Sequence, residues 1–194
     1  QATGNYPGAA RNIDELRADI VKAKSYIPGT HRLNLHEIYG DFKGKVVDRD
    51  EVTPEYFESW IEWAKENNMK LDFNSTSFSH PKSGNLSLAN PDEGIRNFWI
   101  EHTKRCREIS EAMGKAQGDP CIMNLWVHDG SKDQTVNKYL YRSLLKDSLD
   151  KIFATKYDNM KDCIESKVFG IGLESFTVGS NDFYLTQNVT FPSL

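Results

Sequence analysis

Segments with helical periodicity and segments with strand periodicity alternate along the chain, and this alternation restricts the fold more than any other feature of the sequence. A helix between two consecutive strands is the usual connection between parallel strands. The order therefore predicts an α/β protein with a parallel sheet, either an open doubly wound sheet or a (β/α) barrel. The predicted strands cover 32–36, 70–74, 120–126 and 163–168, and the predicted helices that precede them begin near Asn12, Thr53, Asn90 and position 136.

The apolar residues of the predicted strands differ in their spacing. In 32–36 two leucines alternate with Asn34 and His36, which is typical of a strand with one apolar face. The stretch "PCIMNLWV" at 120–127 is nearly continuous in apolar residues. We therefore expect the third strand to be covered on both faces.

Composition favours one soluble domain. The chain has 194 residues, 38% of them hydrophobic, which is enough for one sizeable core, so we expect a single domain over 1–194. The net charge of −4 is dispersed and argues against a nucleic acid partner. The start has no signal-peptide pattern, and no window approaches the ~18 uninterrupted apolar residues of a membrane helix. We expect a cytoplasmic protein in which Cys106, Cys121 and Cys163 are reduced core thiols.

Polar and aromatic residues gather at the carboxyl ends of the predicted strands. Active sites of (β/α)8 barrels are built on that rim, and no Gly-x-Gly-x-x-Gly motif follows any strand, so a barrel is favoured over a dinucleotide-binding sheet. Four strands are half of the eight that a barrel needs, and the chain therefore reads as part of one. The residues concerned are His36, Asn74, His80, Trp126, Asp129, Glu165 and Lys167.

Glu165 and Lys167 lie in the otherwise apolar run "CIESKVFGIGL". A buried carboxylate or ammonium is costly unless it is paired or bound to a metal. One interpretation is an internal ion pair within the sheet. The other is functional: the carboxylate binds a hard divalent cation while the lysine, on the same strand face, contacts a sugar oxygen.

Three further candidates each have a structural alternative. His36 is either a structural histidine at a strand end or a substrate contact. Trp126 is either a core residue or a platform for a sugar ring. His80 could serve only to organise its loop, and Glu174 in "GLES" is a rival carboxylate in a stretch where glycines indicate that the strand is ending.

The motifs "QATGNYPG", "RLNLH", "DFN…FSHP", "NLW…DG…KD" and "ESK.FGIG.ES.TVGSN.FY" occur in this order over residues 1 to about 184. Through these motifs and their order, the chain resembles the L-rhamnose isomerase family. The resemblance implies a (β/α)8 TIM barrel related to xylose isomerase, a cytoplasmic homotetramer, and the isomerisation of L-rhamnose to L-rhamnulose. It also implies manganese or another divalent ion, such as Zn²⁺ or Co²⁺.

Four site residues follow from the resemblance. Glu165 corresponds to the metal ligand of the family's Glu-x-Lys motif and Lys167 to its sugar-contacting catalytic lysine. His36 and Trp126 correspond to substrate-binding residues. His128 stands where the family is expected to have proline.

The family's other metal ligands, an Asp-x-x-His motif and further Asp and His residues, are expected beyond the segment that matches here. The chain is therefore expected to correspond to a central portion of the enzyme, with negligible activity alone. Two alternatives stay open: a related metal-dependent sugar epimerase, and a non-catalytic half-barrel assembly module.

Overall fold

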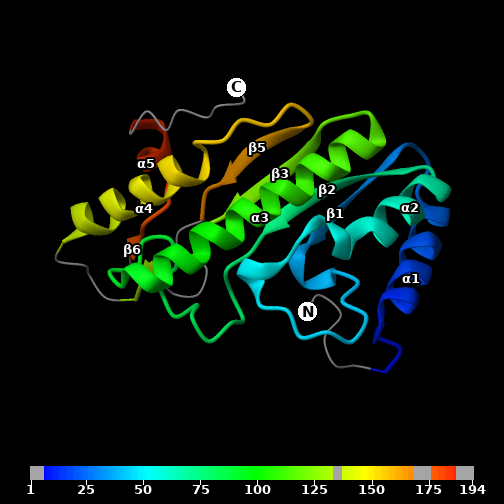
Figure 1. Ribbon diagram of the computed structural model, residues 1–194, viewed down its shortest axis with the longest axis horizontal. Helices are drawn as coiled ribbons and strands as arrows, with labels where there is room; N and C mark the ends of the chain where they lie inside the picture. Colours follow the sequence, from blue (N-terminus) through cyan, green and yellow to red (C-terminus); the bar gives the residue numbers. More distant parts are fainter. Residues whose placement is uncertain (1–6, 133–136, 168–175, 187–194) are drawn as a thin grey trace.

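The computed structural model describes residues 7–132, 137–167 and 176–186, and its centre is a four-stranded parallel sheet (Figure 1). The strands pair in the order β1, β2, β3, β5, and every pairing between them is parallel. The predicted parallel α/β arrangement is confirmed. The strands are β1 (His31–His36), β2 (Met69–Ser75), β3 (Cys121–Trp126) and β5 (Met160–Glu165).

Helices connect the strands, as the alternation predicts. The α-helices are α1 (Ile13–Tyr26), α2 (Glu58–Glu66), α3 (Glu93–Gln117), α4 (Lys138–Ile152) and α5 (Asn181–Thr186). Short 3-10 helices follow β1 and precede α2: η1 (Glu37–Tyr39), η2 (Arg49–Glu51) and η3 (Pro54–Phe57). A small antiparallel ribbon, not predicted, joins β4 (Gly130–Ser131) to β6 (Phe176–Thr177).

Side-chain caps fix where the helices begin. The Asn12 side chain accepts a hydrogen bond from the Glu15 amide at 2.9 Å, as the sequence predicts. The third helix begins later than predicted, because Asp92 rather than Asn90 is its N-cap and accepts from the Ile95 amide at 3.0 Å. None of the described helices is long and apolar enough to cross a membrane.

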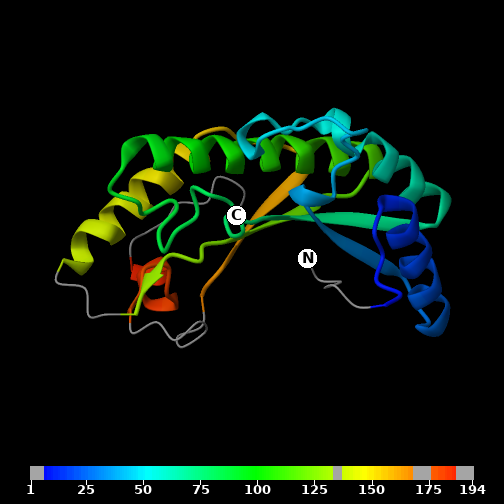
Figure 2. The ribbon, with the colours of Figure 1, turned by 90° about the horizontal axis from the view of Figure 1, so that it is seen from below.

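Helices α2 and α3 cover one face of the sheet, and α5 lies apart from this layer (Figure 2). Helix α3 lies along β2 and β3 and also contacts β5, while α2 contacts β2 and α4 contacts α3. The core between these layers is one cluster of buried apolar side chains. It includes Leu35, Phe57, Trp60, Leu71, Phe73, Trp99, Ile109, Met123, Leu145 and Leu149.

Two expectations about the strands are wrong. The third strand is not buried on both faces: Ile122, Asn124 and Trp126 are only half-buried, because no described segment covers that side of β3. The last strand begins at Met160 and ends at Glu165 rather than covering 163–168. Lys167 therefore lies beyond the strand.

A buried ion pair fixes β5 against the helical layer. Arg107 of α3 contacts Asp162 of β5 with two hydrogen bonds of 2.8 and 2.9 Å, and the two side chains are 1% and 0% exposed. The same guanidinium donates to the carbonyl oxygens of Ile152 and Thr155. Every charge of the pair is therefore hydrogen-bonded, as burial requires.

Side chains complete the sheet where β2 and β3 separate. The two strands are in register over only three residue pairs, from Phe73 to Ser75 on β2. Towards their amino ends, the Asp72 carboxylate accepts from the Ile122 amide at 2.8 Å. The Gln117 side chain accepts from the Leu71 amide and donates to its carbonyl, at 2.8 and 3.1 Å. Polar side chains thus replace the missing backbone ladder.

The cysteines only partly match the expectation of core thiols. Cys106 and Cys121 are buried, but Cys163 is exposed, because it points to the uncovered face of β5. Burial raises the pKa of the Cys121 thiol to about 12 and that of Cys106 well above its ordinary value.

Arg107→Met leaves the Asp162 carboxylate buried without its partner, so we expect the free energy of unfolding to fall by about 3–5 kcal/mol. Combining it with Asp162→Leu removes both charges and should restore much of the loss. Urea titration of the single and double variants measures both effects. Lys146→Met, which breaks an exposed pair with Asp150, is the control and should change stability by less than about 0.5 kcal/mol. An Arg107 variant as stable as the wild type would contradict the assigned role.

In the native protein, Cys163 should react with a thiol reagent while Cys106 and Cys121 react only after unfolding, because the buried thiols are shielded and stay protonated. Mass spectrometry of peptides labelled before and after denaturation locates the modified sites. Cys163→Ser should abolish the native reaction. Rapid native labelling of Cys121 would show that the layer between helices and sheet opens readily.

Candidate functional site

The face of the sheet that the described helices leave open carries mainly polar side chains. Alternation along each strand places these residues on one side, and each of them is half-buried or exposed. From β1 to β5 they are Arg32, Asn34, His36, Lys70, Asp72, Asn74, Ile122, Asn124, Trp126, Lys161, Cys163 and Glu165.

Charged side chains hold the amino end of this face together. The Arg32 guanidinium donates two hydrogen bonds of 2.7 Å to Asp72 and a third to Asp119. Its pKa is raised, chiefly by the hydrogen bond to Asp72. Lys70 and Arg32 together lower the pKa of Asp119. The charged residues at this end of the face therefore have a structural role.

Uncharged polar groups line the carboxyl end of β1 and β2. His36 is the last residue of β1 and is in register with Asn74 of β2. Its Nε2 lies 3.1 Å from the Asn74 amide nitrogen. The Asn74 oxygen accepts from the Asn34 amide at 3.2 Å. Burial lowers the pKa of His36, which favours the neutral ring.

Glu165 ends β5 on the same face. Its Oε2 accepts a hydrogen bond of 2.6 Å from the Asn124 amide on β3, and Asn124 is in turn in register with Asn74. The Glu165 side chain is exposed, so its charge needs no buried partner in the described chain. Among the described residues, Glu165 belongs to no group of three potential metal ligands.

Trp126 ends β3 in register with Glu165 and is half-buried rather than part of the core. Its ring makes an edge contact with Phe78 at 5.9 Å and a tilted contact with His128 at 6.3 Å. A partly exposed indole beside a carboxylate can stack on the apolar face of a sugar.

Lys167 is separated from Glu165 by the end of the strand. Its side chain is buried, its Nζ donates to the His128 carbonyl at 2.5 Å, and its backbone amide donates to the Gly179 carbonyl at 3.1 Å. The expectation that Lys167 and Glu165 share a strand face therefore does not apply. The lysine contacts the carbonyl of residue 128, an acceptor that proline would also supply.

The other candidates have structural roles or lie outside the described residues. Asp129 is fully buried and accepts hydrogen bonds from Ser87 and Ala89, which fixes their loop. His80 stacks on Phe98 at 5.0 Å and binds Asp48 at 3.0 Å, so it organises its loop. Glu174 lies outside the described residues.

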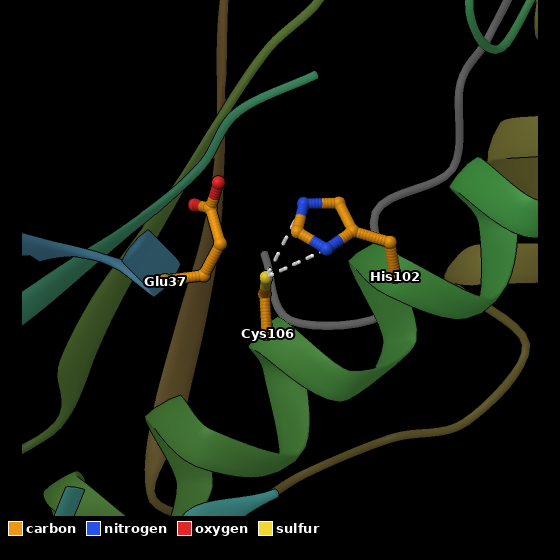
Figure 3. Close-up of side chains that lie close together, drawn as sticks. All are labelled: Glu37, His102 and Cys106. Atoms are coloured by element: carbon orange, nitrogen blue, oxygen red, sulfur yellow. Dashed lines mark hydrogen bonds between the residues drawn. The ribbon is translucent and has the colours of Figure 1, made fainter. Parts of the chain in front are cut away.

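Sequence reasoning missed one group of potential metal ligands on the helix-covered side. Figure 3 shows His102 and Cys106 on adjacent turns of α3, with Glu37 approaching from the end of β1. One ligand atom from each lies within 4.8 Å of the others. The spacing of His102 and Cys106, four residues apart on a helix, was the only sequence signal for this group.

Most polar atoms of this group already have partners in the protein, although one Glu37 oxygen, Oε2, is buried without one among the described residues. Both ring nitrogens of His102 are directed at backbone carbonyl oxygens, of Arg49 at 3.1 Å and of Thr76 at 3.0 Å. Burial lowers the pKa of His102, and a neutral ring has a single N–H, so only one of the two nitrogens can donate to these carbonyls. The Cys106 sulfur lies 4.0 and 3.8 Å from the two nitrogens (Figure 3), and burial raises the pKa of its thiol well above the ordinary value, which disfavours the thiolate that binds metals. The other Glu37 oxygen already binds Thr76 and Arg49. The group instead ties η1 and η2 to α3.

A divalent cation at the open face would find one suitable oxygen donor in Glu165. Hard cations such as Mn²⁺ require about six oxygen or nitrogen donors. Among the described residues, no group of three potential metal ligands includes Glu165. Other donors are therefore needed to complete such a site.

Comparison with known proteins assigns the chain. The sequence model of the family described as L-rhamnose isomerase (RhaA) matches residues 1–194. An L-rhamnose isomerase of Bacteroides thetaiotaomicron is 85% identical over 95% of this chain. Those of Rhodopirellula baltica and Mannheimia succiniciproducens are each 54% identical, over 94% and 98% of it.

These alignments cover 44%, 43% and 46% of the three relatives, so the chain spans less than half of their length. The matched region contains the open polar face, with His36, Trp126 and Glu165 at the carboxyl ends of three strands. By the match of its whole length, the chain belongs to the L-rhamnose isomerase family.

Proposed function

We propose that this chain forms one wall of a metal-dependent (β/α)8 barrel that isomerises L-rhamnose to L-rhamnulose. The observation that carries the proposal is the 85% identity, over 95% of the chain, to a protein named L-rhamnose isomerase. The cytoplasmic homotetramer that the resemblance implies is part of the same proposal.

The sheet supports the barrel. It is parallel throughout, helices cover one face, and within the described residues β1 and β5 each have a strand neighbour on one side only. Two open edges and an uncovered polar face are what remains when part of a barrel wall is taken by itself. The other strands would come from the portion of the relatives that this chain does not cover.

Glu165 is the proposed ligand of the divalent cation, Mn²⁺ or an ion such as Zn²⁺ or Co²⁺. A cation bound there supplies Lewis-acid polarisation of the sugar's oxygens. Within this chain, the Asn124 amide holds one carboxylate oxygen of Glu165 at 2.6 Å and restricts its orientation. Among the described residues Glu165 belongs to no group of three potential ligands, which agrees with a site that is completed elsewhere.

Lys167, His36 and Trp126 are the proposed groups that act on the sugar. Lys167 supplies a compact positive charge that stabilises negative charge developing on a sugar oxygen. His36 donates or accepts a hydrogen bond, and Trp126 supports the apolar side of the sugar. The placement of His36 and Trp126 at the ends of β1 and β3, with Lys167 just beyond the end of β5, agrees with a rim that binds one small molecule.

Two substitutions separate metal binding from turnover in the protein of full family length. Glu165→Gln keeps the shape of the side chain but removes its charge, so we expect Mn²⁺ affinity to fall by at least about tenfold. Lys167→Met removes the positive charge, and we expect kcat to fall roughly 100-fold with little change in Mn²⁺ affinity. Calorimetric titration and an assay of L-rhamnulose measure the two effects.

Lys161→Met and Glu55→Gln are matched controls, since both residues are exposed and Lys161 lies on the same face of β5 as Glu165. Neither should change affinity or turnover appreciably. Unaltered Mn²⁺ affinity in the Glu165 variant would remove its role as ligand. An epimerised aldose in place of the ketose would identify a related sugar epimerase, and full-length protein without any sugar turnover would favour an assembly module.

A further inference from the structure

The two ring nitrogens of His36 have different surroundings. Nε2 lies 3.1 Å from the side-chain nitrogen of Asn74. Nδ1 has no hydrogen-bond partner among the described residues. It is not one of the buried side-chain atoms that lack a partner, so it is accessible rather than buried. Within the described part of the chain, Nδ1 is therefore the ring nitrogen that remains available to a ligand on the open face.

The orientation of the Asn74 amide determines which nitrogen carries the proton. A side-chain amide nitrogen only donates, and its oxygen only accepts. The Asn74 oxygen accepts from the Asn34 amide at 3.2 Å, so the Asn74 NH₂ group faces His36. A donor facing Nε2 requires a lone pair there. The proton of the neutral ring is then on Nδ1.

Burial lowers the pKa of His36 by more than the neighbouring Glu37 charge raises it, so the neutral ring is favoured. Glu37 follows His36 in the chain, but its carboxylate binds Thr76 and Arg49 on the helix-covered side. On its own face, the nearest acidic side chain along β2 is Asp72, which is held by Arg32. Tyr39 of η1 meets the ring edge to face at 6.1 Å. Among the described residues, the half-buried ring thus contacts the uncharged side chains of Asn74 and Tyr39.

We propose that Asn34 and Asn74 are positioning residues that hold His36 as the Nδ1–H tautomer, so that it meets the ligand as a hydrogen-bond donor. The inference rests on the proposed role of His36 in binding the sugar. A neutral ring protonated at Nδ1 donates to a hydroxyl or carbonyl oxygen and cannot remove a proton at that atom. Its contribution is then recognition of a sugar oxygen rather than base catalysis.

Ring nitrogens of ¹⁵N-labelled protein report the tautomer directly. Spectra that correlate them with the ring C–H protons are recorded at a pH of about 8, above the ordinary histidine pKa of about 6.5. His36→Gln identifies the signals of His36. We expect an unprotonated Nε2 and a protonated Nδ1 in the wild type. A protonated Nε2 there would overturn the proposal.

Asn74→Asp and Asn34→Asp test the two amides separately. A carboxylate at 74 can only accept, so Nε2 must become protonated. A carboxylate at 34 should turn the Asn74 amide, because it accepts from the NH₂ group and leaves the Asn74 oxygen facing His36. We therefore expect the same change of tautomer from a residue that does not touch the ring. An unchanged tautomer in the Asn34 variant would overturn its role.

Asn124→Asp is the matched control for charge. It places a carboxylate on the same face, in register with Asn74, but Asn124 makes no hydrogen bond to Asn74 or His36. We expect its His36 to keep the Nδ1–H tautomer. If the His36 tautomer changed in Asn124→Asp as much as in Asn74→Asp, the added charge would be the cause and the proposal would be contradicted.

Adding L-rhamnose to the full-length protein separates this inference from the proposed function. A shift of the His36 Nδ1 signal on addition of the sugar supports its role as donor. No shift, together with intact turnover, would remove His36 from the proposed sugar site. The tautomer measured without sugar would still decide the roles of Asn34 and Asn74.

Discussion

The buried ion pair between Arg107 and Asp162 determines how β5 presents its side chains. A carboxylate in that position is tolerable only with its guanidinium partner, so Asp162 must face α3. Because side chains alternate along a strand, Cys163 and Glu165 must then face the open side. A shift of β5 by one residue would bury Glu165 and expose Asp162. The proposed metal ligand is thus placed by a contact on the opposite face of the sheet.

Similar residue types have different roles on the two faces of the sheet. On the covered side, Glu37, His102 and Cys106 lie close together, yet their polar atoms are largely used in fixing loops to α3. On the open side, Asn124 and Glu165 form a hydrogen bond and remain accessible to a ligand. Proximity of ligand-type side chains is therefore a weak indicator of a site when most of their polar atoms already bind other groups of the protein.

Much of the fold could be predicted because periodicity is a local property. The alternation of elements gave all four parallel strands, and strand ends placed His36, Trp126 and Glu165 on one rim. The position of Lys167 could not be predicted, because strand pairing rather than the apolar run decides where β5 ends. The pairing of Arg107 with Asp162 was also inaccessible: residues 55 apart in sequence meet only once α3 has packed on the sheet. The orientation of the Asn74 amide depends likewise on a neighbouring strand.

Where β2 and β3 separate, the molecule builds part of its sheet from side chains. Asp72 and Gln117 pair with backbone groups of Ile122 and Leu71, positions that a regular ladder would join through main-chain atoms alone. Main-chain hydrogen bonds can form with almost any side chain, whereas the hydrogen bonds of Asp72 and Gln117 require these two residue types. Where these strands separate, the structure of the sheet therefore depends on side chains, and a single substitution can change it. An acidic residue on the open face, which would otherwise invite a catalytic interpretation, is here a structural tie between strands.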